Sequence, residues 1–226
     1  MTTYVVRVWV PDRPGALGAV ASRIGAVRGD LVGIDILERG GGRAIDELLV
    51  DLPEDSLVPL LISEVSQVDG VDVEDVRPAP DWLADPRLDA LETAAVLVDQ
   101  HSVTALLDRL VSHAVHDFTA EWGAVVDVES PVPLTTVGSV PPSQWLEAFV
   151  AGSRASIMPA GGQGGPDDVA WAELDTASLV LVVGRRGRPF RSRERQQLVA
   201  LARIANHRWV ELVTRVTRMI HPSATP

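Results

Sequence analysis

Val10-Pro11-Asp12-Arg13-Pro14-Gly15-Ala16-Leu17 is the stretch of sequence that decides the fold of the N-terminal region. It stands between a segment of alternating apolar residues and a segment with helical apolar spacing. Pro14 fixes its own φ and Gly15 adopts backbone angles that other residues avoid, so together they favour a tight turn. A helix that begins at this turn has first N–H groups without partners inside the helix, and its dipole favours an anion there. The sequence therefore predicts a strand, a turn and a helix N-terminus that can hold a carboxylate.

Apolar periodicity predicts the elements around this turn. Val6, Val8 and Val10 share one face of an expected half-buried strand over 4–10. Helical spacing of apolar residues predicts a helix over 16–28, which Gly29 ends. The further expected elements are strands at 31–38, 43–52 and 71–77 and a helix at 56–68.

Asp12-Arg13-Pro14-Gly15-Ala16-Leu17 resembles the Asp/Asn-Arg-Pro-Gly-x-Leu ligand loop of ACT domains, and the resemblance extends over roughly residues 4–77. It implies a ferredoxin-like βαββαβ fold and a regulatory module that binds an amino acid between paired copies. The residues it assigns to the ligand are Asp12, Arg13, Pro14, Gly15, Ala16 and Leu17 in the turn, with Asp30 and Leu31 at the start of the second strand.

Asp30 departs from the family pattern, since many ACT domains have Asn at the start of this strand. An ionised Asp only accepts hydrogen bonds, so it suits a ligand ammonium and repels a neighbouring carboxylate. Two interpretations of the motif stay open. The turn binds a ligand, or it serves only to start the helix.

The second region begins after a linker expected at 79–86, where the sequence is rich in proline. A helical stretch from 88 to about 118 is expected to break near 100–102, with Ser102 capping its second piece. The other expected elements are strands at 120–128, 134–137, 169–174 and 179–184, helices at 142–151 and 192–218, and a glycine-rich loop at 160–166.

The end of this region resembles the closing strands and helix of GAF domains. The resemblance is carried by 168–174, by 178–185, by Arg188-Pro189-Phe190 and by Glu194. It implies an antiparallel sheet with flanking helices. The chain is therefore expected to be an α+β protein with an ACT-like domain at 1–78, a linker at 79–86, a GAF-like domain at 87–220 and a disordered tail at 221–226.

Composition excludes several classes of protein. The 226 residues carry a formal net charge of −11, which disfavours binding to nucleic acid or to an anionic membrane. The 20 basic residues are all arginine, and cysteine is absent, which excludes disulfides, thiol nucleophiles and thiolate metal sites. The start of the chain does not resemble a secretory signal, and no apolar run approaches a membrane span, so we expect a cytoplasmic protein.

Two clusters have both a functional and an ordinary interpretation. His113 and His116, with Asp117, are a metal site or ordinary histidines of a helix. The second cluster is rich in arginine and indicates either a phosphate or acidic-partner site or a solvated turn and helix start. Its members are Arg185, Arg186, Arg188, Arg191, Arg193 and Arg195.

The sequence lacks a nucleophile elbow, a phosphate-binding loop and a dinucleotide fingerprint. We therefore expect no enzyme, no cofactor and no metal. The leading hypothesis is a homodimeric regulatory protein that senses an amino acid or other small metabolite through its ACT-like domain and passes the signal to an unknown protein partner. The alternative is an interaction or structural module whose ligand pockets are degenerate, and Asp30 and Leu31 are the feature that favours it.

Overall fold

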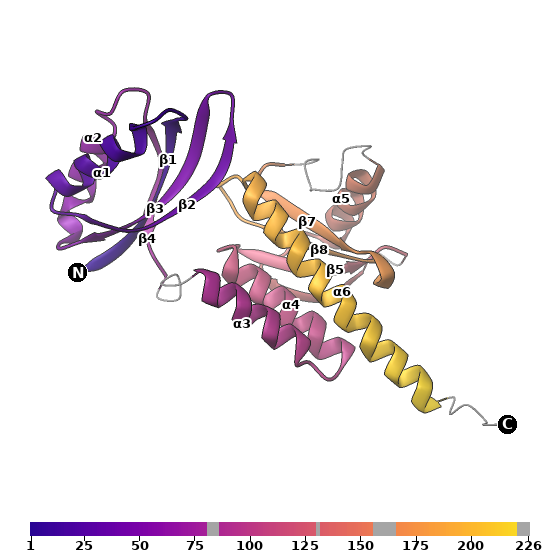
Figure 1. Ribbon diagram of the computed structural model, residues 1–226. Coiled ribbons are helices and arrows are strands. Elements are labelled where there is room, and N and C mark those ends of the chain that lie inside the picture. The colour runs from indigo at the N-terminus through magenta and orange to yellow at the C-terminus, as the bar shows by residue number, and fades with distance from the viewer. Residues whose placement is uncertain (81–85, 130–131, 156–165, 221–226) are drawn as a thin grey trace. The chain divides into compact units, whose positions relative to one another are not determined.

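The computed structural model describes residues 1–80, 86–129, 132–155 and 166–220 (Figure 1). Most of the expected linker (81–85), most of the expected glycine-rich loop (160–165) and the expected tail (221–226) lie outside the described residues. The chain divides into two compact units, Met1–Ala84 and Asp85–Pro226, each of which is described by itself. The division falls within the segment 79–86 that the sequence predicts as a linker.

Unit 1 is a four-stranded antiparallel sheet with the strand order β2-β3-β1-β4. Helices α1 and α2 lie side by side and cover one face of this sheet (Figure 1). The elements are β1 (Thr2–Pro11), α1 (Ala16–Ala26), β2 (Asp30–Gly40), β3 (Arg43–Leu52), a short 3-10 helix (Asp55–Leu57), α2 (Val58–Val65) and β4 (Asp72–Pro78).

The core of unit 1 lies between the sheet and its two helices. Val6 and Val8 of β1 pack there with Val20 of α1 and with Leu61 of α2, and all four side chains are fully buried. The expectation that β1 is half-buried is wrong, because its other face is also buried at Val5 and Arg7. Arg7 is tolerated at a buried position because its guanidinium is paired with the carboxylate of Glu47.

Unit 2 is a second four-stranded antiparallel sheet, with the strand order β6-β5-β8-β7. Its elements are α3 (Pro86–Val98), α4 (Val103–Asp117), β5 (Trp122–Asp127), β6 (Pro133–Gly138), α5 (Ser143–Ala155), β7 (Val169–Leu174), a short 3-10 helix (Asp175–Ala177), β8 (Leu179–Gly184) and α6 (Ser192–Ile220). The break expected near 100–102 separates α3 from α4, and Ser102 caps α4 by accepting a hydrogen bond from the Ala105 N–H at 3.2 Å.

Both faces of the second sheet are covered. Leu181 and Val183 of β8 pack with α3, α4 and α6, whereas Val180 and Val182 pack with α5. A strand buried on both faces is expected to be a continuous apolar run, and 179–183 is such a run. Among the described helices, none is both long and apolar enough to cross a bilayer.

Candidate functional site

The turn between β1 and α1 is exposed and is held by backbone hydrogen bonds. The Asp12 N–H donates to the Gly42 carbonyl at 2.9 Å, and the Arg13 N–H donates to the Pro11 carbonyl at 2.8 Å. Gly15 stands immediately before α1 with φ +86° and ψ −15°, a left-handed conformation that side chains rarely adopt. The tight turn predicted from Pro14 and Gly15 is therefore present, and glycine is required in it for a conformational reason.

The N-terminus of α1 carries backbone donors without acceptors. The Ala19 N–H donates to the Gly15 carbonyl at 3.0 Å, but within the described residues the N–H groups of Leu17 and Gly18 find no backbone or side-chain acceptor. The first turn of α1 contains no acidic residue, and no side chain caps it. The partial positive charge of this helix end is therefore not balanced by its own residues, which favours an external anion.

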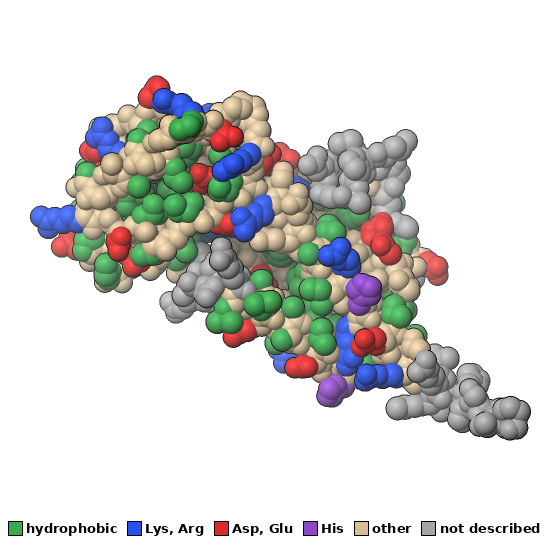
Figure 2. Space-filling model, in the orientation of Figure 1, with side chains coloured by type: hydrophobic (Ala, Val, Ile, Leu, Met, Phe, Trp, Pro, Cys, Tyr) green, Lys and Arg blue, Asp and Glu red, His purple; other side chains and the backbone are tan. Residues whose placement is uncertain are grey.

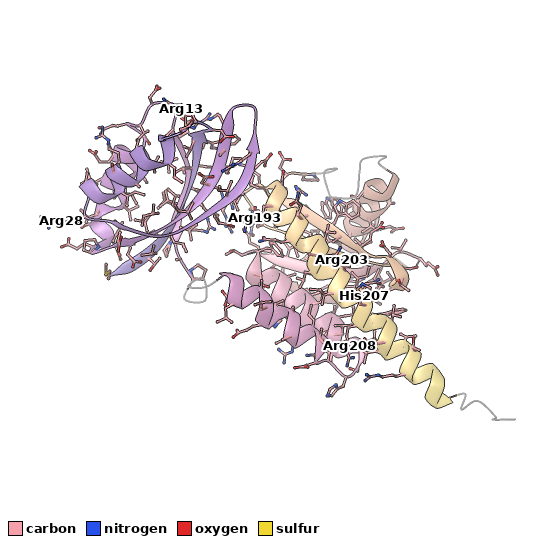
Figure 3. All side chains as sticks on the ribbon, viewed as in Figure 1. Arg13, Arg28, Arg193, Arg203, His207 and Arg208 are labelled. Atoms are coloured by element: carbon pink, nitrogen blue, oxygen red, sulfur yellow. The ribbon has the colours of Figure 1, made fainter. Side chains whose placement is uncertain are left out.

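Asp30 and Leu31 lie at the opposite end of the sheet from this turn. Asp30 pairs with Asp51 at one end of β3, whereas Pro11 pairs with Arg43 at the other end. Because a strand advances about 3.3 Å per residue, the two ends are about 26 Å apart. Figure 3 labels Arg13 of the turn and Arg28, which precedes β2, at different ends of unit 1. One chain alone therefore does not bring the two parts of the expected site together.

Arg13 is the cationic side chain of the turn. Its guanidinium contacts Asp69 at 3.3 Å, with 59% of the Arg13 side chain and 98% of the Asp69 side chain exposed. An ion pair as exposed as this one contributes little to stability. Arg13 can therefore exchange this partner for a ligand at small cost.

Asp46 lies at the same end of the sheet as the turn and was missed by the sequence analysis. Only 3% of Asp46 is exposed, and its Oδ1 has no hydrogen-bond partner in the described part of the chain. Burial raises the pKa of the Asp46 carboxyl; Arg39 opposes this rise, and the negative charges of Asp12 and Asp35 add to it. Within the strand at 43–52, Asp46 falls on the alternate positions that face inward, and this acidic residue among inward-facing positions is the sequence signal for it.

The other face of the first sheet carries a network of charges around Glu47. Arg7 donates to Glu47 Oε1 through Nε at 3.0 Å and through Nη2 at 2.8 Å, and Arg77 donates to the same oxygen at 2.9 Å. Burial alone would raise the pKa of Glu47, but Arg7 and Arg77 together hold that pKa below its ordinary value. This network stabilises the sheet, and its members come from β1, β3 and β4.

The arginine cluster that follows β8 is largely structural, so neither of its two expected interpretations describes Arg185. This side chain is buried and donates to both oxygens of Glu194 at 2.7 and 2.9 Å, as well as to the Phe118 carbonyl at 2.6 Å. Its guanidinium also lies 4.0 Å from the centre of the Phe190 ring. Arg195 is buried too and donates to the Val169 carbonyl at 3.0 Å. These bonds join the start of α6 to the sheet.

The charges on the visible surface do not form a basic patch. On the face that Figure 2 shows, acidic and basic side chains are interspersed. The exposed Arg186 of the cluster is itself paired with Glu121 at 3.0 Å.

His113 and His116 lie within hydrogen-bond distance of side chains of α3 and α4. The Thr93 hydroxyl donates to Asp117 at 2.9 Å and lies 3.0 Å from Nδ1 of His113. Nδ1 of His116 lies 3.2 Å from Asp117 Oδ1. Over the described residues, no group of three His, Cys, Asp or Glu side chains is placed to hold a metal ion.

Comparison with known proteins gives only distant likenesses. No protein-family model matches the chain, and no curated protein matches it. Among solved structures, an unknown protein from Galdieria sulphuraria is 16% identical with a TM-score of 0.31, over 44% of this chain and 64% of that one. A formyltetrahydrofolate deformylase from Pseudomonas putida KT2440 is 16% identical with a TM-score of 0.30, over 43% of this chain and 39% of that one.

A third structure, the bacteriophytochrome RpBphP3 from R. palustris, is similar over more of the chain. It is 11% identical with a TM-score of 0.37, over 80% of this chain and 48% of that one. The chain spans less than two thirds of the length of each of these three proteins. No assignment of function follows from these likenesses.

Proposed function

We propose that the chain is a non-enzymatic regulatory protein that senses an amino acid or another small metabolite. Unit 1 is proposed to be an ACT-like, ferredoxin-like βαββαβ domain, and unit 2 a GAF-like domain. The motif at 12–17, the order of elements in unit 1 and the strand order β2-β3-β1-β4 support the first proposal. The motifs at 168–174 and 188–194 support the second.

The single observation that carries this proposal is the pair of unpartnered N–H groups at Leu17 and Gly18. These groups lie in the first turn of α1, a helix of 11 residues that has no acidic side chain in that turn. Two backbone donors and the helix dipole act on the same point and favour a carboxylate there. Arg13, which is mostly exposed, adds a positive charge to the same turn.

A second copy of the chain is proposed to complete the site. Strand β2 is an edge strand, and it exposes 53% of Val32 and 47% of Ile34. If two copies paired their β2 strands antiparallel, the start of one β2 would lie beside the end of the other, which is the end of the sheet nearest the turn. Asp30 and Leu31 of the second copy would then lie at the same end of the sheet as this chain's turn.

The proposed dimer can be tested by sedimentation. We expect the full chain to sediment as a dimer, and we expect Ile34→Lys to shift it toward monomer because the charge is introduced on the edge strand. Leu60→Lys, on the exposed face of α2 (Leu60 is 47% exposed), is the matched control and should leave the dimer intact. A wild-type monomer at all concentrations would remove the second copy from the proposal.

The alternative function is an interaction or structural module that binds no small molecule. The separation of Asp30 and Leu31 from the turn within one chain favours it. In either case the signal or contact passes to another protein, and we propose that the protein acts in the cytoplasm.

Thermal melting of the full chain distinguishes these two functions. The probes are the twenty L-amino acids, purine nucleotides and cyclic nucleotides. A compound at 100 times its Kd stabilises the folded state by about 2.7 kcal/mol, which is a readily measured shift. We expect a shift with at least one amino acid. The absence of a shift with every compound would favour the interaction module.

A further inference from the structure

We propose that Asp46 binds the ammonium group of the sensed molecule, so that the site selects α-amino acids over carboxylates that lack an amine. This inference rests on the proposed function and deepens it by naming the chemical class of the ligand. The carboxylate within the motif at 12–17 is that of Asp12, which is exposed, whereas Asp46 is buried and lies more than 25 positions further along the sequence.

The pairing of the strands places Asp46 on the face of the sheet that α1 and α2 cover. Asp46 stands between Val8 of β1 and Ile36 of β2 in the sheet. Directly paired residues point to the same face, and Val8 points into the core beneath the helices. Ala16 and Val20 of α1 pack in that same core. The carboxylate therefore lies on the face of the sheet that carries the helix N-terminus, near the end of the sheet where the turn begins.

Asp46 is buried, and one of its two carboxylate oxygens has no hydrogen-bond partner among the described residues. The residue is 3% exposed, and this oxygen, Oδ1, is fully buried. Buried charged groups are otherwise paired, as Glu47 on the opposite face is paired with Arg7 and Arg77. A buried carboxylate oxygen without a hydrogen bond is a feature that stability alone does not favour.

The charges around Asp46 leave room for a cation. Asp12 from the turn and Asp35 from β2 interact with Asp46 as like charges, and Arg39 from β2 is the opposing positive charge. The net charge of these four side chains is negative.

The helices do not supply a second cation to this group. The one charged side chain within α1 is Arg23, and it donates to Glu64 of α2 at 2.9 Å. Arg39 is therefore the one positive charge among these groups that acts on Asp46, and the excess of negative charge favours an external cation.

The two halves of the site have opposite signs. The N–H groups of Leu17 and Gly18 favour a carboxylate, and the Asp46 side favours a cation. A simple anion satisfies only the first half and is repelled by the second, whereas an α-amino acid satisfies both. The chemistry of this end of unit 1 thus matches a zwitterion.

The test compares each L-amino acid with the 2-hydroxy acid that has the same side chain. Calorimetric titration of the full chain at pH 7 should show that the best-binding amino acid loses affinity by at least about 10-fold when its ammonium is replaced by hydroxyl. Asp46→Asn should weaken the amino acid by a similar factor and leave the hydroxy acid unchanged. Glu54→Gln, which removes one charge from an exposed loop, is the control and should bind like the wild type.

The outcomes separate this inference from the proposed function. If amino acids bind but the hydroxy acids bind equally well, or Asp46→Asn has no effect, Asp46 is not the ammonium site and the proposed sensor stands. If no amino acid binds the wild-type chain, both fail together.

A second measurement does not need a ligand. Because burial raises the pKa of Asp46, its carboxylate destabilises the fold above that pKa, and the penalty disappears as the pH falls below the ordinary value. Asp46→Asn should therefore melt at a higher temperature than the wild type at pH 8, and the difference should shrink toward pH 4. A lower melting temperature for Asp46→Asn at pH 8 would mean that the carboxylate stabilises the core, and would overturn the inference.

Discussion

Arg7 and Glu47 show how one residue pair permits charge inside the first sheet. Arg7 is fully buried, and its guanidinium donates twice to Glu47. The sequence analysis did not predict this burial, because the alternation of Val6, Val8 and Val10 left Arg7 on the face expected to be solvated. Only the register of β1 against β3, which pairs Arg7 with Glu47, identifies its partner. The register depends on residues that are far apart in the sequence, so the pattern of one strand does not predict which residues pair.

Glu47→Gln should lower the free energy of unfolding by about 3 kcal/mol, because it removes the negative charge to which the buried Arg7 donates twice. The pKa of Glu47 lies below its ordinary value in the folded chain, so its stabilisation is present above that ordinary value and is lost as the pH falls through the folded pKa. Urea denaturation between pH 3 and pH 7 measures both effects.

The control for this variant is Asp72→Asn, which breaks the exposed pair between Asp72 and Arg43 and should cost less than about 1 kcal/mol. Equal losses for the two variants would show that burial of Arg7 does not govern the strength of its ion pair.

Gly15 is the residue on which the turn depends. Its φ of +86° is unfavourable for any side chain, although an added Cβ would meet no atom within 4 Å. Gly15→Val should therefore destabilise the chain by about 2 kcal/mol through the backbone alone, and it should abolish the melting shift produced by an amino acid. Gly25→Ala, inside α1 and with equally open space, should stabilise the chain by about 0.5–1 kcal/mol and keep the shift. A retained shift in Gly15→Val would place the ligand elsewhere.

The elements were more predictable than the residues that join them. Strands form over the predicted 43–52, 169–174 and 179–184, because their apolar patterns are strong and bounded by turn residues. The helix expected at 56–68 is instead a 3-10 helix followed by the shorter α2, since Pro59 belongs in the first turn of a helix and not in its interior. Pattern alone placed Arg185 either in a phosphate or acidic-partner site or in a solvated turn, because its partner Glu194 is brought to it only by the packing of α6.

The cap of α4 can be tested within a single helix. Ser102 accepts a hydrogen bond from the Ala105 N–H, so Ser102→Ala should cost about 1 kcal/mol of stability. Ser112 is also exposed in α4, but its hydroxyl donates to the Asp108 carbonyl inside the helix. Ser112→Ala should be neutral or slightly stabilising. Chemical denaturation of both variants checks the difference, and an equal cost for the two would argue against a capping role for Ser102.

At the scale of the whole molecule, the chain has two units with separate cores. Leu61 belongs to the core of unit 1, and Leu106 belongs to the core of unit 2. Both are fully buried, so each substitution by alanine should cost about 2–5 kcal/mol. Scanning calorimetry should resolve two transitions, with Leu61→Ala lowering one and Leu106→Ala lowering the other. A single transition lowered by both variants would mean that the units unfold together.

The account as a whole depends on the backbone amides that open α1. NMR spectra of the ¹⁵N-labelled full chain, titrated with the L-amino acid that gives the largest melting shift, observe those amides directly. We predict that the resonances of Leu17 and Gly18 move furthest and saturate with the same affinity as the melting shift. Resonances of Leu17 and Gly18 that stay fixed while other amides move would contradict the proposed site.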